Sequence, residues 1–193
     1  MRHVTALAPV CIFAALLTGC GSTPPSRFYT LSAARGAATA SSNVSVVVGP
    51  VAVPAVVDRP QIVVDIGANQ VRLEEFNRWA APLQAGIARV VADNLVQMLS
   101  TPRVTLSAQT LSADADFRAT IDVQSFQSAP EEAATLDAVW IVRRTKDGKA
   151  ETGRTTVREP VQEKGYDGLA AAHSRALARL SQDIANAVQS LAR

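Results

Sequence analysis

The chain has 193 residues, of which 48% are hydrophobic, and its formal net charge at pH 7 is +2. This length suffices for one domain with a sizeable hydrophobic core. The near balance of 19 Lys and Arg against 17 Asp and Glu argues against a nucleic-acid binder that relies on a strong positive field.

The first 19 residues have the pattern of a secretory signal peptide. Arg2 and His3 precede an apolar stretch that ends in small residues. Pro9 interrupts this stretch, which is also shorter than the roughly 20 apolar residues that a membrane-spanning helix needs. We therefore expect residues 1–19 to be removed on export.

The apolar stretch ends in Leu17-Thr18-Gly19-Cys20, which resembles a bacterial lipobox. The resemblance implies cleavage before Cys20 and a diacylglycerol on its thiol; the alternative is an ordinary signal peptide with a chance cysteine. Two or three acyl chains anchor a protein stably, whereas one holds it only marginally. Gly21 follows the cysteine, which by analogy with lipoprotein sorting in Gram-negative bacteria implies the outer membrane. Cys11 leaves with the signal, so no intrachain disulfide is expected.

Residues 20–43 are expected to form the lipidated N-terminus, with a short strand between two linkers. The first linker, residues 21–26, is small, polar and Pro-rich, and RFYTL follows as the strand. The second, Ser32 to Asn43, has no apolar periodicity and predicts a mobile loop. Residues 44–193 are then expected to form a single periplasmic domain.

The first half of this domain is predicted to be three strands and a helix. Residues 43–53 are rich in β-branched side chains, and QIVVDI and QVRLEE are two strands split by the turn residues 67–69. After Pro82, apolar residues at steps of three and four predict an amphipathic helix that ends near Pro102.

The second half is predicted to return to strands and to close with a helix. RVTLSA is a short strand, and apolar and polar residues alternate in DFRATIDVQSF. TLDAVWIVRRT and GRTTVREPVQ flank the Asp-Gly turn of a hairpin, and an apolar stripe predicts a helix from about Tyr166. The pattern favours an α+β fold, with an antiparallel or mixed β-sheet and two amphipathic helices packed on one face.

The sequence contains few candidate catalytic residues. His173 is the only histidine after residue 19 and lies beside the apolar stripe of the last predicted helix, so we expect it to be a packing residue. One histidine and no free thiol exclude a Cys–His pair and a multi-His metal site. No nucleotide-binding or nucleophile-elbow motif is present. A hydrolase using distant carboxylates stays open but unsupported, and we predict no catalytic residue, no metal and no cofactor beyond the lipid on Cys20.

The densest positive patch is in the predicted hairpin near the C-terminus. Acidic residues dilute it, so a solvated hairpin is favoured over a phosphate-binding site. Its basic members are Arg143, Arg144, Lys146, Lys149, Arg154 and Arg158.

Two short motifs stand out in residues 48–83. Asp58-Arg59-Pro60-Gln61 sets a charge pair and an amide before an apolar strand, and Asn77-Arg78-Trp79 lies just before a helix. Trp and Arg suit a packed interface anchor, so Asp58, Arg59, Gln61, Arg78 and Trp79 are candidate partner-binding residues. The equally weighted alternative is that Asp58 and Arg59 pair locally while Trp79 fills the edge of the core.

These motifs resemble the PqiC/YmbA family of ABC-type transport auxiliary lipoproteins. The resemblance covers essentially the whole chain after Cys20. Ala55-Val56-Val57 departs from it, where relatives often carry a bulkier residue. The matching residues are Tyr29-Thr30-Leu31, Val48-Gly49-Pro50-Val51, Asp58 to Val63, Asn77-Arg78-Trp79, Pro82-Leu83 and Asn94-Leu95.

The resemblance implies an outer-membrane component of an MCE-type system that moves lipid or other hydrophobic molecules between two membranes. The implied partners are a PqiB-like MCE-domain protein and, indirectly, an ABC permease–ATPase pair or a PqiA-like membrane protein. A ring-shaped homo-oligomer would suit a collar around a tunnel. Two alternatives stay open: a soluble-domain lipid carrier, and a general envelope-assembly factor without a transport partner.

Overall fold

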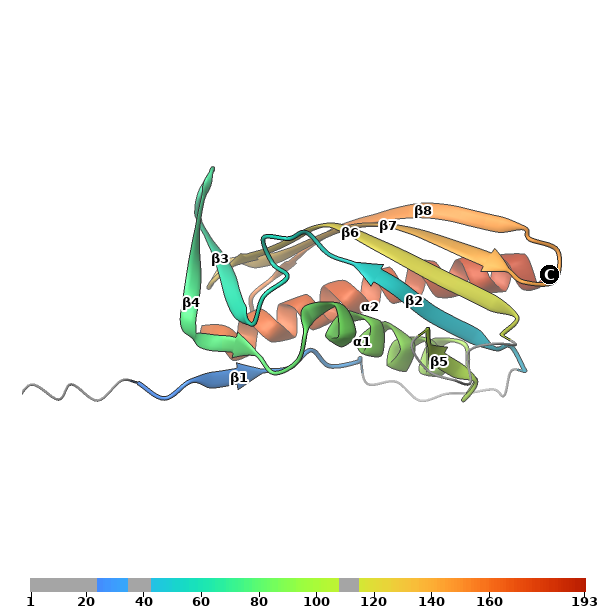
Figure 1. Ribbon diagram of the computed structural model, residues 1–193, viewed down its shortest axis with the longest axis horizontal. Helices are drawn as coiled ribbons and strands as arrows, with labels where there is room; N and C mark the ends of the chain where they lie inside the picture. Colours follow the sequence, from blue (N-terminus) through green and yellow to red (C-terminus); the bar gives the residue numbers. More distant parts are fainter. Residues whose placement is uncertain (1–23, 35–42, 108–114) are drawn as a thin grey trace, which may run out of the picture.

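The computed structural model describes residues 24–34, 43–107 and 115–193, and these form two mixed β-sheets and two helices (Figure 1). The α+β class is confirmed, although the strands divide into two sheets. In chain order the elements are β1 (Arg27–Tyr29), β2 (Val46–Ala52), β3 (Gln61–Gly67), β4 (Gln70–Trp79), α1 (Leu83–Met98), β5 (Val104–Leu106), β6 (Phe117–Ala129), β7 (Ala133–Arg144), β8 (Ala150–Pro160) and α2 (Gly165–Ala192).

The larger sheet has the strand order β5-β2-β6-β7-β8. β2 runs parallel to both of its neighbours, while β6, β7 and β8 are antiparallel. Burial along β6 follows the alternation expected from sequence, since Phe117, Ala119, Ile121 and Val123 are buried. One face of this sheet is therefore apolar and needs a cover.

Both helices cover that face. α1 packs against β2 and β5, α2 packs against β7 and β8, and the two helices contact each other. Figure 1 shows them side by side on one side of the sheet. The apolar stripes predicted from sequence are fully buried at Ile87 and Leu95 of α1 and at Leu177, Leu180 and Ile184 of α2. The prediction of two amphipathic helices on one sheet face is confirmed.

Pro50 lies where the pairing of β2 is interrupted. The β2–β6 register shifts between Val48 and Val51, and the pairing of β2 with β5 extends only over Val46–Val48. Gly49 has φ +109°, a backbone conformation that glycine adopts without strain. Proline has no N–H to donate, so the bulge lets it sit in a strand without breaking a ladder hydrogen bond.

The smaller sheet has the order β1-β4-β3 and lies at one end of the molecule (Figure 1). β3 and β4 are antiparallel, and β1 runs parallel to β4 with Tyr29 opposite Trp79. β4 continues to Trp79, beyond the strand predicted over residues 70–75, because β1 supplies a second partner for its last residues. This sheet brings the start of the described chain beside the candidate motifs.

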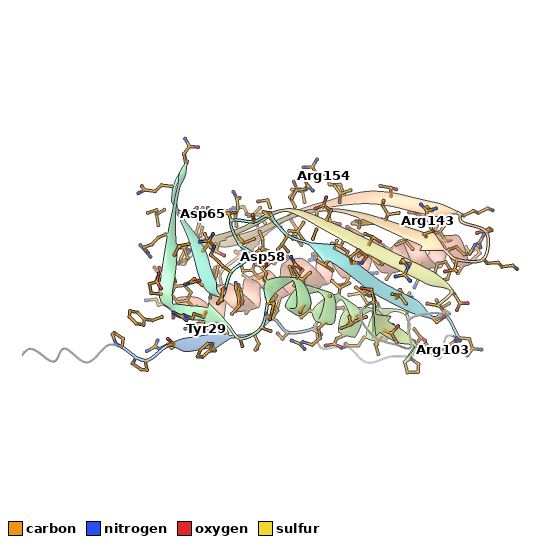
Figure 2. The ribbon with its side chains drawn as sticks, in the orientation of Figure 1. Tyr29, Asp58, Asp65, Arg103, Arg143 and Arg154 are labelled. Carbon is orange, nitrogen blue, oxygen red and sulfur yellow. The ribbon has the colours of Figure 1, made fainter. Side chains whose placement is uncertain are left out.

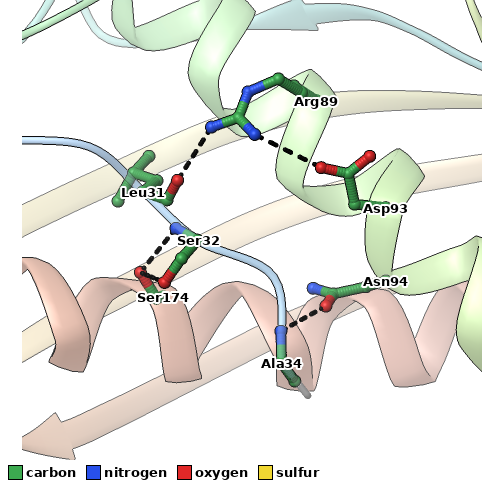
Figure 3. Close-up of polar contacts among 7 residues, drawn as sticks. All are labelled: Leu31, Ser32, Ala34, Arg89, Asp93, Asn94 and Ser174. Carbon is green, nitrogen blue, oxygen red and sulfur yellow. Dashed lines mark hydrogen bonds and ion pairs between the residues drawn. The ribbon is translucent and has the colours of Figure 1, made fainter. Parts of the chain in front are cut away.

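Residues 31–34 run between the two helices and are held by both (Figure 3). The backbone N–H of Ser32 donates to Ser174 Oγ of α2 at 3.1 Å, and the N–H of Ala34 donates to Asn94 Oδ1 of α1 at 2.8 Å. Arg89 of α1 donates to the Leu31 carbonyl at 2.9 Å. The loop predicted at residues 32–43 therefore begins as a bound segment. Residues 35–42 lie outside the described residues, as do the predicted signal peptide and Cys20.

Replacing Asn94 by alanine is expected to lower the free energy of unfolding by about 1–3 kcal/mol. Asn94 is buried, and besides accepting from Ala34 it donates to Ser181 Oγ of α2 at 3.1 Å. The alanine variant leaves the Ala34 N–H without its acceptor. Urea unfolding of the variant measures the loss, and Arg89→Gln, which breaks a more exposed contact to the same segment, is the matched control.

Candidate partner-docking site

The two motifs singled out from the sequence meet at the base of the small sheet. The N–H groups of Val57 and Asp58 donate to the Pro54 carbonyl at 3.0 and 3.2 Å, which closes a turn before β3. The N–H of Trp79 donates to the Pro60 carbonyl at 2.7 Å and fastens this turn to the end of β4. The segments 54–60 and 77–79 therefore become neighbours through backbone hydrogen bonds.

A surface pocket of about 360 Å³ opens where these segments meet the start of α1. Asp58 lies on its rim, where its carboxylate accepts a hydrogen bond from Gln84 in the first turn of α1 at 3.2 Å. Figure 2 shows Asp58 between the small sheet and α1, far from Arg143 toward the other end of the molecule. The lining residues are Asp58, Arg59, Pro60, Trp79, Ala80, Ala81, Pro82 and Leu83.

Arg59 is the half-buried cation of this pocket. Its Nε is buried without an acceptor, and no hydrogen bond or ion pair joins its guanidinium to another described residue. Its neighbour Asp58 bonds to Gln84 instead. A desolvated N–H without an acceptor costs about 1–3 kcal/mol, and more for a charged group. The pocket thus contains a guanidinium whose hydrogen-bonding capacity the described residues leave unused.

Trp79 forms the floor of the pocket and also belongs to the core. Its side chain is only 7% exposed. The indole ring lies edge-on to Phe126 of β6 and His173 of α2, with ring centroids 6.2 and 6.0 Å away. The Phe126 and His173 rings stack on each other at 3.9 Å. Most of Trp79 therefore contacts the chain itself, although the residue also lines the pocket.

His173 is completely buried beneath Trp79, as expected for a packing residue. Its Nε2 is 2.8 Å from Ser128 Oγ, and its Nδ1 is buried without a partner among the described residues. Burial disfavours the charged imidazolium and lowers the pKa of His173 to about 3. The ring is thus neutral and sealed from solvent, which does not suit a general base.

The structure places Gln61 and Arg78 beside the pocket but not in its wall. They are paired across β3 and β4. Arg78 turns along its own strand, where its Nε donates to the Glu75 carbonyl at 2.8 Å and its guanidinium lies 3.8 Å from the Glu75 carboxylate. Of the five candidate residues, three therefore line one pocket and two flank it.

The sequence did not identify the residues that pack against Trp79. Phe126 and His173 lie 47 and 94 residues further along the chain, so no local spacing connects them with the Asn77-Arg78-Trp79 motif. The one available signal was the position of His173 beside the apolar stripe of its helix. Only the packing of α2 against the sheets joins the three rings.

Three of the six basic side chains of the hairpin form ion pairs with nearby acidic residues. Arg144 pairs with Asp147 at 2.6 Å, Arg154 pairs with Asp137, and Arg158 pairs with Glu132. The side-chain hydrogen bond from Arg144 lowers the pKa of Asp147 to about 2. These pairs favour the solvated-hairpin interpretation over a phosphate site.

Across residues 24–34, 43–107 and 115–193, no group of three or more His, Cys, Asp or Glu side chains is placed to hold a metal ion. Within the same ranges, neither helix combines the length and apolarity needed to cross a bilayer. The fold thus defines a small α+β domain with a surface pocket where the two sequence motifs meet.

The chain belongs to the family of ABC-type transport auxiliary lipoprotein components, whose sequence model matches residues 29–185. This confirms the resemblance to the PqiC/YmbA family. The family description names a transport component and not an enzyme. No curated protein matches the sequence.

Two solved structures share the fold. One is the crystal structure of an uncharacterized protein, 21% identical, with a TM-score of 0.70 over 86% of this chain and 99% of that one. The other is XCC0632 from Xanthomonas campestris, of the DUF330 family, 17% identical, with a TM-score of 0.66 over the same shares. At these identities the similarity establishes the fold alone.

Proposed function

We propose that this protein is an outer-membrane lipoprotein, anchored through Cys20, that acts as a non-catalytic docking subunit of an MCE-type lipid transport system. Its contribution to envelope integrity would come from binding and positioning a periplasm-spanning PqiB-like partner. A permease–ATPase pair or a PqiA-like protein in the inner membrane would complete the system. The anchor keeps the pocket near the bilayer and so raises its effective concentration for that partner.

The observation that carries this proposal is the Arg59 guanidinium in the pocket, which has no hydrogen-bond or ion-pair partner among the described residues. A docking partner can supply a carboxylate or carbonyl oxygen as the acceptor that the guanidinium does not find among the described residues. Pro60, Pro82 and Leu83 provide apolar walls around this polar centre, and small residues 80 and 81 leave room beside them. An arginine in a partly desolvated apolar pocket is a frequent hot spot of protein interfaces.

Docking is better supported than carriage of lipid by the domain itself. The two larger hollows formed by described residues open at the surface and have charged side chains in their walls. Asp116 and Arg144 line one of them, and Glu159 and Arg175 line the other. An acyl chain buried against such charges would leave them desolvated, which is unfavourable.

A ring of several copies would match the proposed role as a collar around a tunnel. β8 and β5 are the outermost strands of the larger sheet, so their open edges are where copies could pair. The ring remains part of the proposal, and a second copy captured at the pocket would show that the docking site serves self-association instead.

Replacing Arg59 by glutamine is expected to weaken partner binding about 10- to 100-fold, since a hydrogen bond to a charged group contributes about 1.5–3 kcal/mol. A photo-crosslinking residue at Asp58, which is exposed on the rim, would capture an MCE-domain protein in cells, and the added Arg59→Gln change would abolish the product. Asp58 suits the probe better than Trp79, whose ring is buried.

The matched control is Arg143→Gln, which removes an exposed arginine from the other end of the molecule (Figure 2). This variant should crosslink like the parent, and both arginine variants should keep the parent's unfolding midpoint. Unchanged capture by the Arg59→Gln protein would refute the docking role of the pocket.

A further inference from the structure

Exposed apolar side chains concentrate on the small sheet. Of the seven large hydrophobic side chains that are exposed among the described residues, five belong to β1, β3 or β4. Phe28 is the most exposed, at 64%. Several apolar side chains exposed together on one surface commonly mark an interaction site. The five are Phe28, Ile66, Val71, Leu73 and Phe76.

The two aromatic residues of this set, Phe28 and Phe76, form an exposed surface close to the N-terminal strand. Phe28 is paired with Arg78 across β1 and β4, so both side chains point to the same side of the sheet. Phe76 lies two residues before Arg78 on β4 and is 37% exposed, at a point where the β3–β4 register shifts. Tyr29 and Trp79, the next pair, point the other way and are buried. We call this the Phe28–Phe76 face.

This face is also the part of the fold closest in sequence to the predicted anchor. Phe28 lies eight positions after Cys20, and a fully extended chain spans about 3.3–3.6 Å per residue. Phe28 therefore stays within about 30 Å of an acyl chain on Cys20. An anchored molecule must bring this end of the fold to the bilayer surface more often than any other end.

We propose that the Phe28–Phe76 face lies against the phospholipid surface in which Cys20 is anchored. The proposal rests on the lipid anchor of the proposed function. Aromatic rings settle at the boundary between headgroups and acyl chains, and a second contact adds to the hold of the acyl chains. Arg78 is already engaged by Glu75, so the contact depends on the two rings and not on anionic lipid.

Fluorescence quenching in vesicles tests this contact. The full-length protein, isolated from membranes with Cys20 acylated, is reconstituted into phosphatidylcholine vesicles that contain nitroxide-labelled lipid. An environment-sensitive fluorophore is attached to Phe28→Cys or Phe76→Cys. Because Cys11 and Cys20 are the chain's only cysteines, the introduced one is the only free thiol of the mature, acylated protein. Ile141→Cys on β7 is the matched control, since Ile141 and Phe76 are both 37% exposed.

The expected result is blue-shifted emission at positions 28 and 76, quenched by the nitroxide lipid, with neither effect at position 141. If the protein floats with the vesicles but all three probes stay unquenched, the membrane contact is refuted and the lipid anchor is not. Protein that does not float overturns both. A blue shift without lipid quenching shows that a second copy covers the face and also overturns the proposal.

Discussion

Replacing Trp79 by alanine is expected to lower the free energy of unfolding by about 3–5 kcal/mol, the usual range for truncating a buried aromatic residue. The indole packs against Phe126 and His173, and its removal opens a cavity between β4, β6 and α2. A domain of this size is stable by about 5–15 kcal/mol, so this loss is a large part of the total.

Urea unfolding of the Trp79→Ala protein measures this effect, with Trp79→Phe as the control that keeps an aromatic ring. The phenylalanine variant should lose less than half as much. A loss below 1 kcal/mol for Trp79→Ala would contradict the core role of the indole. The result also decides which variant suits docking experiments. A loss of partner binding in Trp79→Ala would reflect loss of folding, whereas a loss in Arg59→Gln would reflect a change in the pocket.

Lowering the pH from 7 to 4.5 is expected to cost about 2–3 kcal/mol of stability through His173 alone. The pKa of this buried histidine falls from 6.5 to about 3 on folding. Below pH 6.5 the histidine binds a proton in the unfolded chain but stays neutral in the folded chain. The free energy of unfolding therefore decreases as the pH is lowered, until the folded histidine is protonated near pH 3. The pKa of Asp147, lowered to about 2, matters only below about pH 4.

The measurement compares unfolding free energies at pH 7 and pH 4.5 for the parent and for His173→Gln. The glutamine retains a polar group near Ser128 but has no proton to gain, so its stability should change much less over this interval. Equal losses in the two proteins would show that other groups set the acid sensitivity. Because the unfolding free energy of each protein is referred to its own value at pH 7, any cost of the substitution itself cancels.

The secondary structure was largely predictable because its signals are local. Alternation in residues 117–124 follows from the two faces of a strand, and the Asp-Gly pair at 147–148 sets a tight turn, with Gly148 at φ +73°. The two apolar stripes predicted the two helices. The length of β4 was underestimated, since its last residues are held in place by β1, a strand that lies more than 40 residues earlier in the chain.

The candidate site was predictable only in part. The motif residues Asp58, Arg59 and Trp79 stand out in the sequence by composition, yet their spacing does not say that they line one pocket. The backbone bond from Trp79 to Pro60 brings them together. Gln61 and Arg78 belong to the same motifs but flank the pocket, because the pairing of β3 with β4 directs them elsewhere.

The sequence by itself determined the class of this protein: an α+β domain of one recognisable family, with a predicted export signal and lipid anchor. It also determined the two amphipathic helices and the strands they cover, because periodicity is a property of neighbouring residues. Only the tertiary structure decided that Trp79 is chiefly a core residue, that the Arg59 guanidinium has no partner among the described residues, and that residues 31–34 are bound between the helices. Those properties depend on groups brought together from positions 47 to 142 residues apart, and free energies of burial and pairing act through space rather than along the chain.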